Sequence, residues 1–369
     1  MGLSALLIPA EPNAFERNNF DAIRLAMALL VVWSHSHAIY LGSEDREPIS
    51  ILMNGTYDSG KVGVLVFFAI SGFLITHSFL NSKSIGRYFS RRVSRIYPGF
   101  IVATLICAFI IIPIFSSRSI SDFTNAEVVK VLGLNLLLQG YFPPSDAFNS
   151  KAVNGSLWSI PYEFWCYIGL AALGIAGVLK YRLACLTTTL AIMAIRVWLD
   201  LTGRHPGGGF IGAVIGYPYL WFVVLPCFMM GASFYLYRDA IPRSRWILLV
   251  GLGSLAIAPN LPLEPPHGQI LTNLLLPPVM SYATFYVAFS ERIKLRDAAV
   301  WGDFSYGTYL YAFPIQQMFF AVVGGSLVFP VFIAISMVLS LTAGVLSWFA
   351  VERWFMTRRP RRRAGVATA

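Results

Sequence analysis

Asp21-Ala-Ile-Arg24-Leu-Ala-Met-Ala-Leu-Leu-Val-Val-Trp-Ser-His35 opens the first apolar run of the chain and carries an arginine and a histidine eleven positions apart. On an α-helix, eleven steps of about 100° bring the two side chains to within roughly 20° of each other, and they lie roughly 16 Å apart along the axis. Ionisable groups inside a membrane are costly unless they line a protein interior or a wet cavity. The stretch therefore predicts a membrane-spanning helix with Arg24 near one surface and His35 near mid-depth, both facing inward.

The composition of the chain is that of a polytopic membrane protein. Hydrophobic residues make up 56% of the sequence and charged residues only 12%, against about 25% charged residues in soluble proteins. We predict an all-α bundle of about ten transmembrane helices that forms a single domain over residues 21–352, since a span needs roughly 20 apolar residues. The apolar runs lie at about 22–42, 62–80, 98–116, 157–178, 183–200, 211–236, 246–259, 270–289, 305–323 and 327–350.

The basic residues predict the orientation of the bundle. Alternate loops are strongly basic, and lysine and arginine are retained on the cytoplasmic side of a membrane. This pattern places both termini in the cytoplasm, with residues 1–20 as an N-terminal segment and residues 353–369 as a basic tail. Orientation and contact with anionic membrane lipids account for the net charge of +10 without nucleic acid. Residues 1–20 lack the pattern of a secretory signal peptide, so the first span acts as its own insertion signal.

The cysteines predict neither a disulfide framework nor a metal site. All four fall in apolar stretches and none belongs to a CxxC pair. We expect them to pack in the core. They are Cys107, Cys166, Cys185 and Cys227.

Six motifs in a fixed order give the sequence a resemblance to the membrane acyltransferase-3 family over nearly its whole length. After the Arg24–His35 stretch come a Phe-Phe-x-x-Ser-Gly-Phe-Leu-Ile motif, an arginine-rich motif, a Ser-Leu-Trp-Ser motif, a Ser-Tyr-Gly-Thr-Tyr-Leu motif and a Val-Glu-Arg motif. They occupy residues 20–35, 66–75, 91–98, 155–163, 305–310 and 351–353. Many members carry a histidine just after the fifth motif, where this chain has Tyr311-Ala312-Phe313-Pro314, so no role of that histidine can be transferred.

The resemblance implies an O-acyltransferase of the bacterial cytoplasmic (inner) membrane. Such an enzyme moves an acyl group, usually acetyl, from cytoplasmic acyl-CoA to a hydroxyl of a carbohydrate or lipid-linked sugar. Acyl-CoA is a cosubstrate, and no tightly bound cofactor is expected. Because the chain ends soon after its last apolar run, we expect a standalone form without an appended hydrolase-like domain. A homo-oligomer is compatible with the sequence.

Two residues of the first span are the predicted catalytic pair. An uncharged imidazole accepts a proton at physiological pH without help from a metal, so His35 is the candidate general base, with Arg24 beside it on the same face. The alternative for an isolated histidine is a core residue hydrogen-bonded between helices. His37 and His77 are weaker candidates, because His37 lies on another face and His77 lies near the inner end of the second span.

The arginine-rich motif predicts the site for the coenzyme A phosphates. Arg91 and Arg95 are four positions apart and Arg92 and Arg95 three apart, so on a helix they converge on one patch. Guanidinium forks suit phosphates. The alternative is that these arginines only fix the topology, as basic residues at the inner surface are expected to do. We expect Arg91, Arg92 and Arg95, with Arg24, to bind the cosubstrate.

The fourth apolar run carries the candidate residues for the acceptor. Trp158, Ser159 and Glu163 surround Pro161, and irregular backbone at membrane depth usually lines a cavity. Glu163 either contacts a sugar hydroxyl or pairs with Arg196 on the neighbouring span. Tyr306 and Tyr309 are further candidates for substrate contacts, Ser71-Gly72-Phe73 is expected to serve helix packing, and Glu352 is expected to end the last helix.

A second class of function fits the same buried charges. A proton-coupled transporter of a small polar solute could use an intramembrane arginine, histidine and glutamate as its substrate path. Composition and topology do not separate this alternative from the enzyme. The family resemblance is what favours the acyltransferase.

Overall fold

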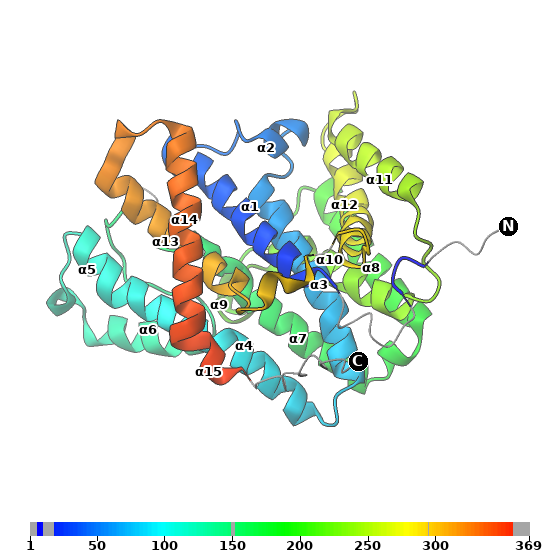
Figure 1. Cartoon of the computed structure of the whole chain (residues 1–369), viewed down its shortest axis with the longest axis horizontal. Coiled ribbons are helices and arrows are strands. Elements are labelled where there is room, and N and C mark those ends of the chain that lie inside the picture. The colour runs from blue at the N-terminus through cyan, green and yellow to red at the C-terminus, as the bar shows by residue number, and fades with distance from the viewer. Residues whose placement is uncertain (1–5, 10–17, 149–151, 294, 357–369) are drawn as a thin grey trace, which may run out of the picture.

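The computed structural model describes residues 6–9, 18–148, 152–293 and 295–356, and these residues are helical apart from loops and one isolated bridge between Leu6 and Pro242 (Figure 1). The α-helices are α1 (Phe20–Leu41), α2 (Pro48–Leu52), α3 (Ser59–Leu80), α4 (Ile85–Ile106), α5 (Ile112–Phe115), α6 (Asn125–Leu136), α7 (Ser159–Ile175), α8 (Arg182–Leu201), α9 (Gly209–Ile215), α10 (Pro218–Leu236), α11 (Arg245–Ile257), α12 (His267–Ala288), α13 (Ser305–Val323), α14 (Phe329–Ser347) and α15 (Arg353–Phe355). Short 3₁₀ or π turns are η1 (Cys107–Ile111), η2 (Ile120–Asp122), η3 (Gly155–Trp158), η4 (Val178–Lys180), η5 (Ala258–Asn260), η6 (Arg296–Ala299), η7 (Gly324–Ser326) and η8 (Trp348–Glu352).

Within the described residues, 7 helices are long and apolar enough to cross a membrane. They are α1, α3, α8, α10, α12 and the two composite helices Ile85–Phe115 and Phe329–Phe355. Three predicted spans fall short of this: α7 has 17 residues, α11 has 13, and α13 carries the buried amides of Gln316 and Gln317. The chain is therefore an all-helical, multi-pass membrane protein, whereas the count of ten spans and the cytoplasmic location of both termini stay predictions.

Two predicted spans have different boundaries from those expected. The run predicted at 211–236 is divided into α9 and α10, because Gly216 has a φ of 87° and Pro218 starts a new helix. The run predicted at 98–116 belongs to a helix that begins at Ile85, so the arginine motif is helical and continuous with the span. The π turn η1 precedes Pro113, whose ring nitrogen has no hydrogen to complete a regular α-helical turn.

Two glycines allow α3 and α10 to cross in the centre of the bundle (Figure 1). A Cβ on Gly72 would lie 1.8 Å from the carbonyl oxygen of Phe228, and a Cβ on Gly231 would lie 2.0 Å from that of Ala69. Neither position can take a side chain without moving the other helix. The packing role predicted for the Ser71-Gly72-Phe73 motif is thus confirmed for Gly72.

The first helix is fixed at both its start and its middle. The Asn19 side chain donates to the carbonyl of Val287 in the last turn of α12 and to that of Ile293 in the loop that follows. Further along, the amide of Gln316 on α13 donates to the carbonyl of Val32 and to Ser36. Since α1 also packs on α3 and α14, the face that carries Arg24 and His35 is held against the bundle. The four cysteines are buried and unpaired, as predicted.

Candidate active site

One large cavity opens at the end of the bundle where α1, α4 and α13 begin and α3 ends. Its volume is about 1950 Å³, which exceeds the roughly 300–1,000 Å³ of ordinary small-molecule sites. Helices α1, α3, α4, α7 and α13 and the segment from η8 to Met356 contribute its walls. We call it the arginine-lined cavity, after its residues Arg24, Arg87, Arg91, Arg92, Arg95 and Arg353.

Two of the predicted phosphate-binding arginines share one carboxylate at the mouth of this cavity. Nη2 of Arg95 lies 2.7 Å from Oδ2 of Asp303, and Nη1 of Arg24 lies 3.6 Å from the same atom. Arg24 also pairs with Asp21 at 3.1 Å. The three side chains of the Asp303 cluster (Arg24, Arg95 and Asp303) are only 13–22% exposed, so the arginines are held by a partner that the sequence motifs did not indicate.

The Asp303 carboxylate is ionised throughout the physiological range. Burial opposes its ionisation, but the guanidinium groups of Arg95 and Arg24 outweigh that effect and lower the pKa of the carboxyl to about 2. Asp303 also accepts the backbone N–H of Ser305 at the start of α13. It therefore joins α1 and α4 to α13 and sets the position of both arginines.

Arg92 lies on the same wall but has no ion pair with any described residue. Its guanidinium lies 5.9 Å from the ring centroid of Tyr167, and its buried Nε has no hydrogen-bond partner among the described residues. Arg91 is exposed at the mouth. Arg91 and Arg92 are thus the members of the motif whose donors are open to an anion, while Arg95 is held by Asp303.

A carboxylate lies deeper in the cavity, on α7. Oε1 of Glu163 accepts hydrogen bonds from Ser71 at 2.7 Å and from Tyr167 at 2.5 Å, and all three residues line the cavity. Ser71, which the sequence suggested only as a packing residue, and Tyr167, which no motif indicated, are therefore parts of the site. A polar residue in a spanning helix, four positions after Glu163, is the signal that could have pointed to Tyr167.

The predicted substrate residues Ser159 and Tyr309 meet at the inner end of the cavity. Their hydroxyl oxygens are 2.7 Å apart, and both side chains are 5% exposed. Tyr306 also lines the cavity, but its hydroxyl donates to the carbonyl of Ile96 and its ring stacks against Arg95. Trp158 is not part of the lining; it is 36% exposed and packs against Tyr162.

His35 lies beyond this inner end rather than in the wall of the cavity. Its ring packs edge-on against Phe313, with centroids 5.0 Å apart, and Phe313 follows Tyr309 by one helical turn on α13. Nδ1 of His35 is buried and has no hydrogen-bond partner among the described residues. The structure thus brings Arg24 into the cavity and places His35 about one turn past Tyr309, with Phe313 between the two.

The other side of His35 is polar. The neighbouring Ser34 donates to Asp58 at 3.1 Å, and Asp58 pairs with Lys61 at 2.7 Å. Asp58 is close enough to act electrostatically on the His35 ring. His35 therefore lies between the arginine-lined cavity and a polar group at the opposite end of the bundle.

Glu352 was expected to end the last helix, but the helix continues beyond it through α15 to Phe355. Glu352 is the last residue of the π turn η8 and is only 2% exposed. Oε1 accepts the hydroxyl of Ser347 at 2.7 Å, whereas the buried Oε2 has no partner among the described residues.

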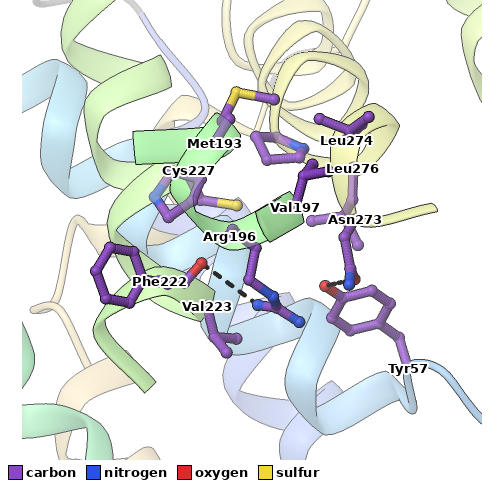
Figure 2. Close-up of a pocket in the computed structure, with 12 residues that line it drawn as sticks. Tyr57, Met193, Arg196, Val197, Phe222, Val223, Cys227, Asn273, Leu274 and Leu276 are labelled. Atoms are coloured by element: carbon purple, nitrogen blue, oxygen red, sulfur yellow. Dashed lines mark hydrogen bonds between the residues drawn. The ribbon is translucent and has the colours of Figure 1, made fainter. Parts of the chain in front are cut away.

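The alternative ion pair between Glu163 and Arg196 is not formed. Arg196 binds both carboxylate oxygens of Asp200 on its own helix, at 2.9 and 2.8 Å, and its Nη1 donates to the carbonyl of Phe222 at 3.3 Å. Asn273 and Tyr219 donate to the same carboxylate at 2.8 Å each. Figure 2 shows Arg196 beside a small cavity of about 10 Å³, with Tyr57 donating to Asn273. Asp200, one turn further along α8, satisfies Arg196. Glu163 instead accepts hydrogen bonds from Ser71 and Tyr167.

Comparison with known proteins identifies the family of the chain. The acyltransferase domain of the acyltransferase-3 family matches residues 17–349. An O-acetyl transferase of Shigella phage Sf6 is 29% identical over 92% of this chain and 96% of its own length. Nodulation protein 10 of Rhizobium leguminosarum bv. viciae is 29% identical over 44% of this chain and 46% of its own length. No solved structure matches the chain. The match spans helices α1, α3, α4, α7 and α13 of the cavity wall, and the chain belongs to the acyltransferase-3 family of membrane acyltransferases.

Proposed function

We propose that this enzyme transfers an acetyl group from acetyl-CoA, bound in the arginine-lined cavity, to a hydroxyl of a carbohydrate or lipid-linked sugar. The observation that carries the proposal is the gradient along the cavity. Free guanidinium groups stand at its mouth, and a neutral hydroxyl pair stands at its inner end, one turn from a histidine. A long ligand with phosphates at one end and a reactive group at the other matches this gradient.

The relatives support the type of group and the type of acceptor atom. The phage protein that covers nearly the whole chain is an O-acetyl transferase by name, so we infer acetyl transfer to oxygen here. The carbohydrate acceptor and the bacterial inner membrane follow from the family resemblance. Membership of an acyltransferase family also favours the enzyme over the proton-coupled transporter. The two functions differ in that a transporter would not consume acetyl-CoA.

The phosphates of the donor bind Arg91 and Arg92 in this proposal, while Arg24 and Arg95 add positive charge from their cluster with Asp303. The arm of the cosubstrate extends along α7, and its thioester reaches Ser159 and Tyr309. Only one of the two hydroxyl protons is used in the hydrogen bond between these residues. The other can be donated to the thioester carbonyl, where it stabilises the oxyanion that forms during attack.

His35 acts as the general base. It takes the proton of the acceptor hydroxyl as that oxygen attacks the thioester carbonyl, the carbon–sulfur bond breaks, and the proton passes to the departing thiolate. Its unpartnered Nδ1 and its place between the cavity and the polar group around Asp58 support this role. An acceptor can then approach from the end of the bundle opposite to coenzyme A.

Acyl transfer from radiolabelled acetyl-CoA to an acceptor-containing carbohydrate extract tests the proposal in membranes that carry the full chain. We expect His35→Ala to lower transfer at least about 100-fold, the usual range for loss of a general base. His37→Ala is the matched control, since His37 hydrogen-bonds to the carbonyl of Trp33 and packs on Phe329. Monodispersity in detergent checks the fold of both variants. Full activity in a folded His35→Ala would remove His35 from the mechanism.

A further inference from the structure

Under the proposed function the arginine-lined cavity binds phosphates, yet Glu163 places a carboxyl group on its wall. Both hydrogen bonds that it accepts converge on Oε1, and Oε2 accepts none from any described residue although Glu163 lines the cavity. An oxygen of this kind can accept a hydrogen bond. Oε2 therefore fits a ligand group with an N–H or O–H donor and offers nothing to a phosphate oxygen, which is itself an acceptor.

The position of Glu163 along the cavity is set by α7. Tyr167, Glu163 and Ser159 succeed one another at intervals of four residues, so they share a face and are separated by about 6 Å each. Arg92 lies over the ring of Tyr167 at one end of this row, and Ser159 bonds to Tyr309 at the other. A ligand that reaches from Arg92 to the hydroxyl pair must pass Glu163.

We propose that Glu163, oriented by Ser71 and Tyr167, forms a subsite for the hydrogen-bond donors of the pantetheine arm. This inference rests on the proposed function and names the part of the donor that the site selects. Between its phosphates and its sulfur, pantetheine carries one hydroxyl and two amide N–H groups. The carboxylate binds one of these donors, selects carriers with an amide arm over simple thioesters and acyl phosphates, and keeps the phosphates at the arginines.

The acceptor-sugar role predicted for Glu163 fits the structure less well. The carboxylate faces the same cavity as the arginines, whereas in the proposed reaction the acceptor reaches His35 from the polar group around Asp58, at the other end of the bundle. A sugar that bound Glu163 would compete with the donor for one space. The pantetheine arm, in contrast, has to cross this space to deliver its thioester.

The experiment compares two donors of the same shape: S-acetylpantetheine, and its analogue with each amide N–H replaced by an ester oxygen. In the wild-type chain we expect KM to be about tenfold lower for the amide than for the ester, because the amide N–H can donate one hydrogen bond to Glu163 that the ester cannot make. In Glu163→Gln the new Oε1 still accepts from Ser71 and Tyr167, but an NH₂ group replaces Oε2. The preference for the amide should then disappear. Glu264→Gln, the same change at an exposed residue outside the cavity, is the matched control and should keep the preference.

Three outcomes decide the inference. Loss of the amide preference in Glu163→Gln alone supports it, and a preference that survives in a folded Glu163→Gln overturns it. Absence of any preference in the wild-type chain also overturns it, so the test does not depend on the variant folding. Competition by unacylated pantetheine and its ester analogue against labelled CoA binding measures the same ratio without turnover. Failure of acetyl transfer itself is therefore distinguishable from failure of this subsite.

Discussion

Two buried arginine clusters of this bundle contain the same kind of ion pair and differ in what surrounds it. Arg95 and Arg24 meet Asp303 at the wall of a cavity of about 1950 Å³, beside an arginine without a carboxylate partner. Arg196 meets Asp200 beside a cavity of about 10 Å³, and Asn273 and Tyr219 donate to the same carboxylate. A space of that size holds one water molecule at most.

The difference shows which property separates a site from a structural network. Both clusters carry charges on helices long and apolar enough to span a membrane, which by itself is the usual sign of a functional residue. In the Arg196 cluster the hydrogen-bonding groups are used within the protein, so it can hold helices but offers nothing to a ligand. In the arginine-lined cavity, Arg92 and Glu163 keep donors and acceptors that no described residue satisfies. Unused hydrogen-bonding capacity next to space, rather than charge, marks the site.

The largest effect expected from this comparison is on stability, at Arg196. Arg196→Met leaves the Asp200 carboxylate buried without a counter-ion, which typically costs 3–5 kcal/mol. We expect a large fall in the thermal midpoint of the detergent-solubilised protein, with KM for acetyl-CoA unchanged in the fraction that stays folded. Intrinsic fluorescence during a temperature ramp and a transfer assay measure the two quantities.

A second substitution in the same cluster serves as its control. Asp200→Asn in the Arg196→Met background removes the unpaired charge, so part of the lost stability should return. If Arg196→Met instead raised KM for acetyl-CoA and left the thermal midpoint unchanged, the cluster would belong to the active site and the comparison would break down.

The next effect is on binding, at Arg92. Arg92→Gln removes a guanidinium that has no carboxylate partner among the described residues, so the folded protein loses little, but a bound phosphate loses a charge-assisted hydrogen bond. We expect KM for acetyl-CoA to rise about tenfold, with little change for S-acetylpantetheine, which has no phosphate. Arg92→Lys should restore only part of the affinity, because an ammonium group lacks the planar fork of guanidinium.

Arg182→Gln is the matched control for Arg92. Arg182 is an exposed arginine at the start of α8 that pairs with Asp239 at 3.4 Å, away from the cavity. Its loss should leave KM unaltered. An equal rise in KM for acetyl-CoA and acetylpantetheine in Arg92→Gln would show that Arg92 does not recognise phosphate, and the phosphate site would then have to lie elsewhere.

The sequence predicted the helical bundle well and its interruptions less well. Long apolar runs identify spans such as α1 and α8 almost to the residue, because burial in lipid demands an uninterrupted apolar helix. Breaks depend on backbone geometry, such as the positive φ of Gly216. The predicted span beginning near residue 98 left out the arginine motif, although the spacing of the arginines suggested a helix. The helix begins at Ile85 and includes the motif, because charged residues are tolerated in a helix that faces a cavity.

At the site, the sequence predicted residues but not their partners. Arg92, Ser159 and Tyr309 line one cavity, and their roles in binding stay predictions. Asp303 is separated from Arg95 by more than 200 positions, and no local spacing reveals such a pair. The same holds for Ser71 and Glu163, which lie on different helices and meet only because the glycine-mediated crossing of α3 and α10 brings α3 deep into the bundle.

A third group of charges, at the end of the bundle opposite to the cavity mouth, extends the comparison. Glu44 lies in the loop after α1, near Asp58 and Lys61. Burial and the neighbouring Asp58 carboxylate raise the pKa of Glu44 to about 7. This carboxyl is expected to change its charge near neutral pH.

The smallest effect follows from the sign of this shift. The folded chain holds a proton on Glu44 between about pH 4.5, where the unfolded group titrates, and pH 7, so stability is greatest at the acidic end and is lost as the pH rises through 7. We expect the thermal midpoint of the wild-type protein to fall modestly between pH 5 and pH 8. Glu44→Gln, which keeps the hydrogen-bonding shape of the protonated acid, should reduce this slope and have its largest stabilising effect at pH 8. An unchanged slope in Glu44→Gln would mean that other groups at this end of the bundle carry the pH dependence, and that Glu44 keeps one charge state between pH 5 and pH 8.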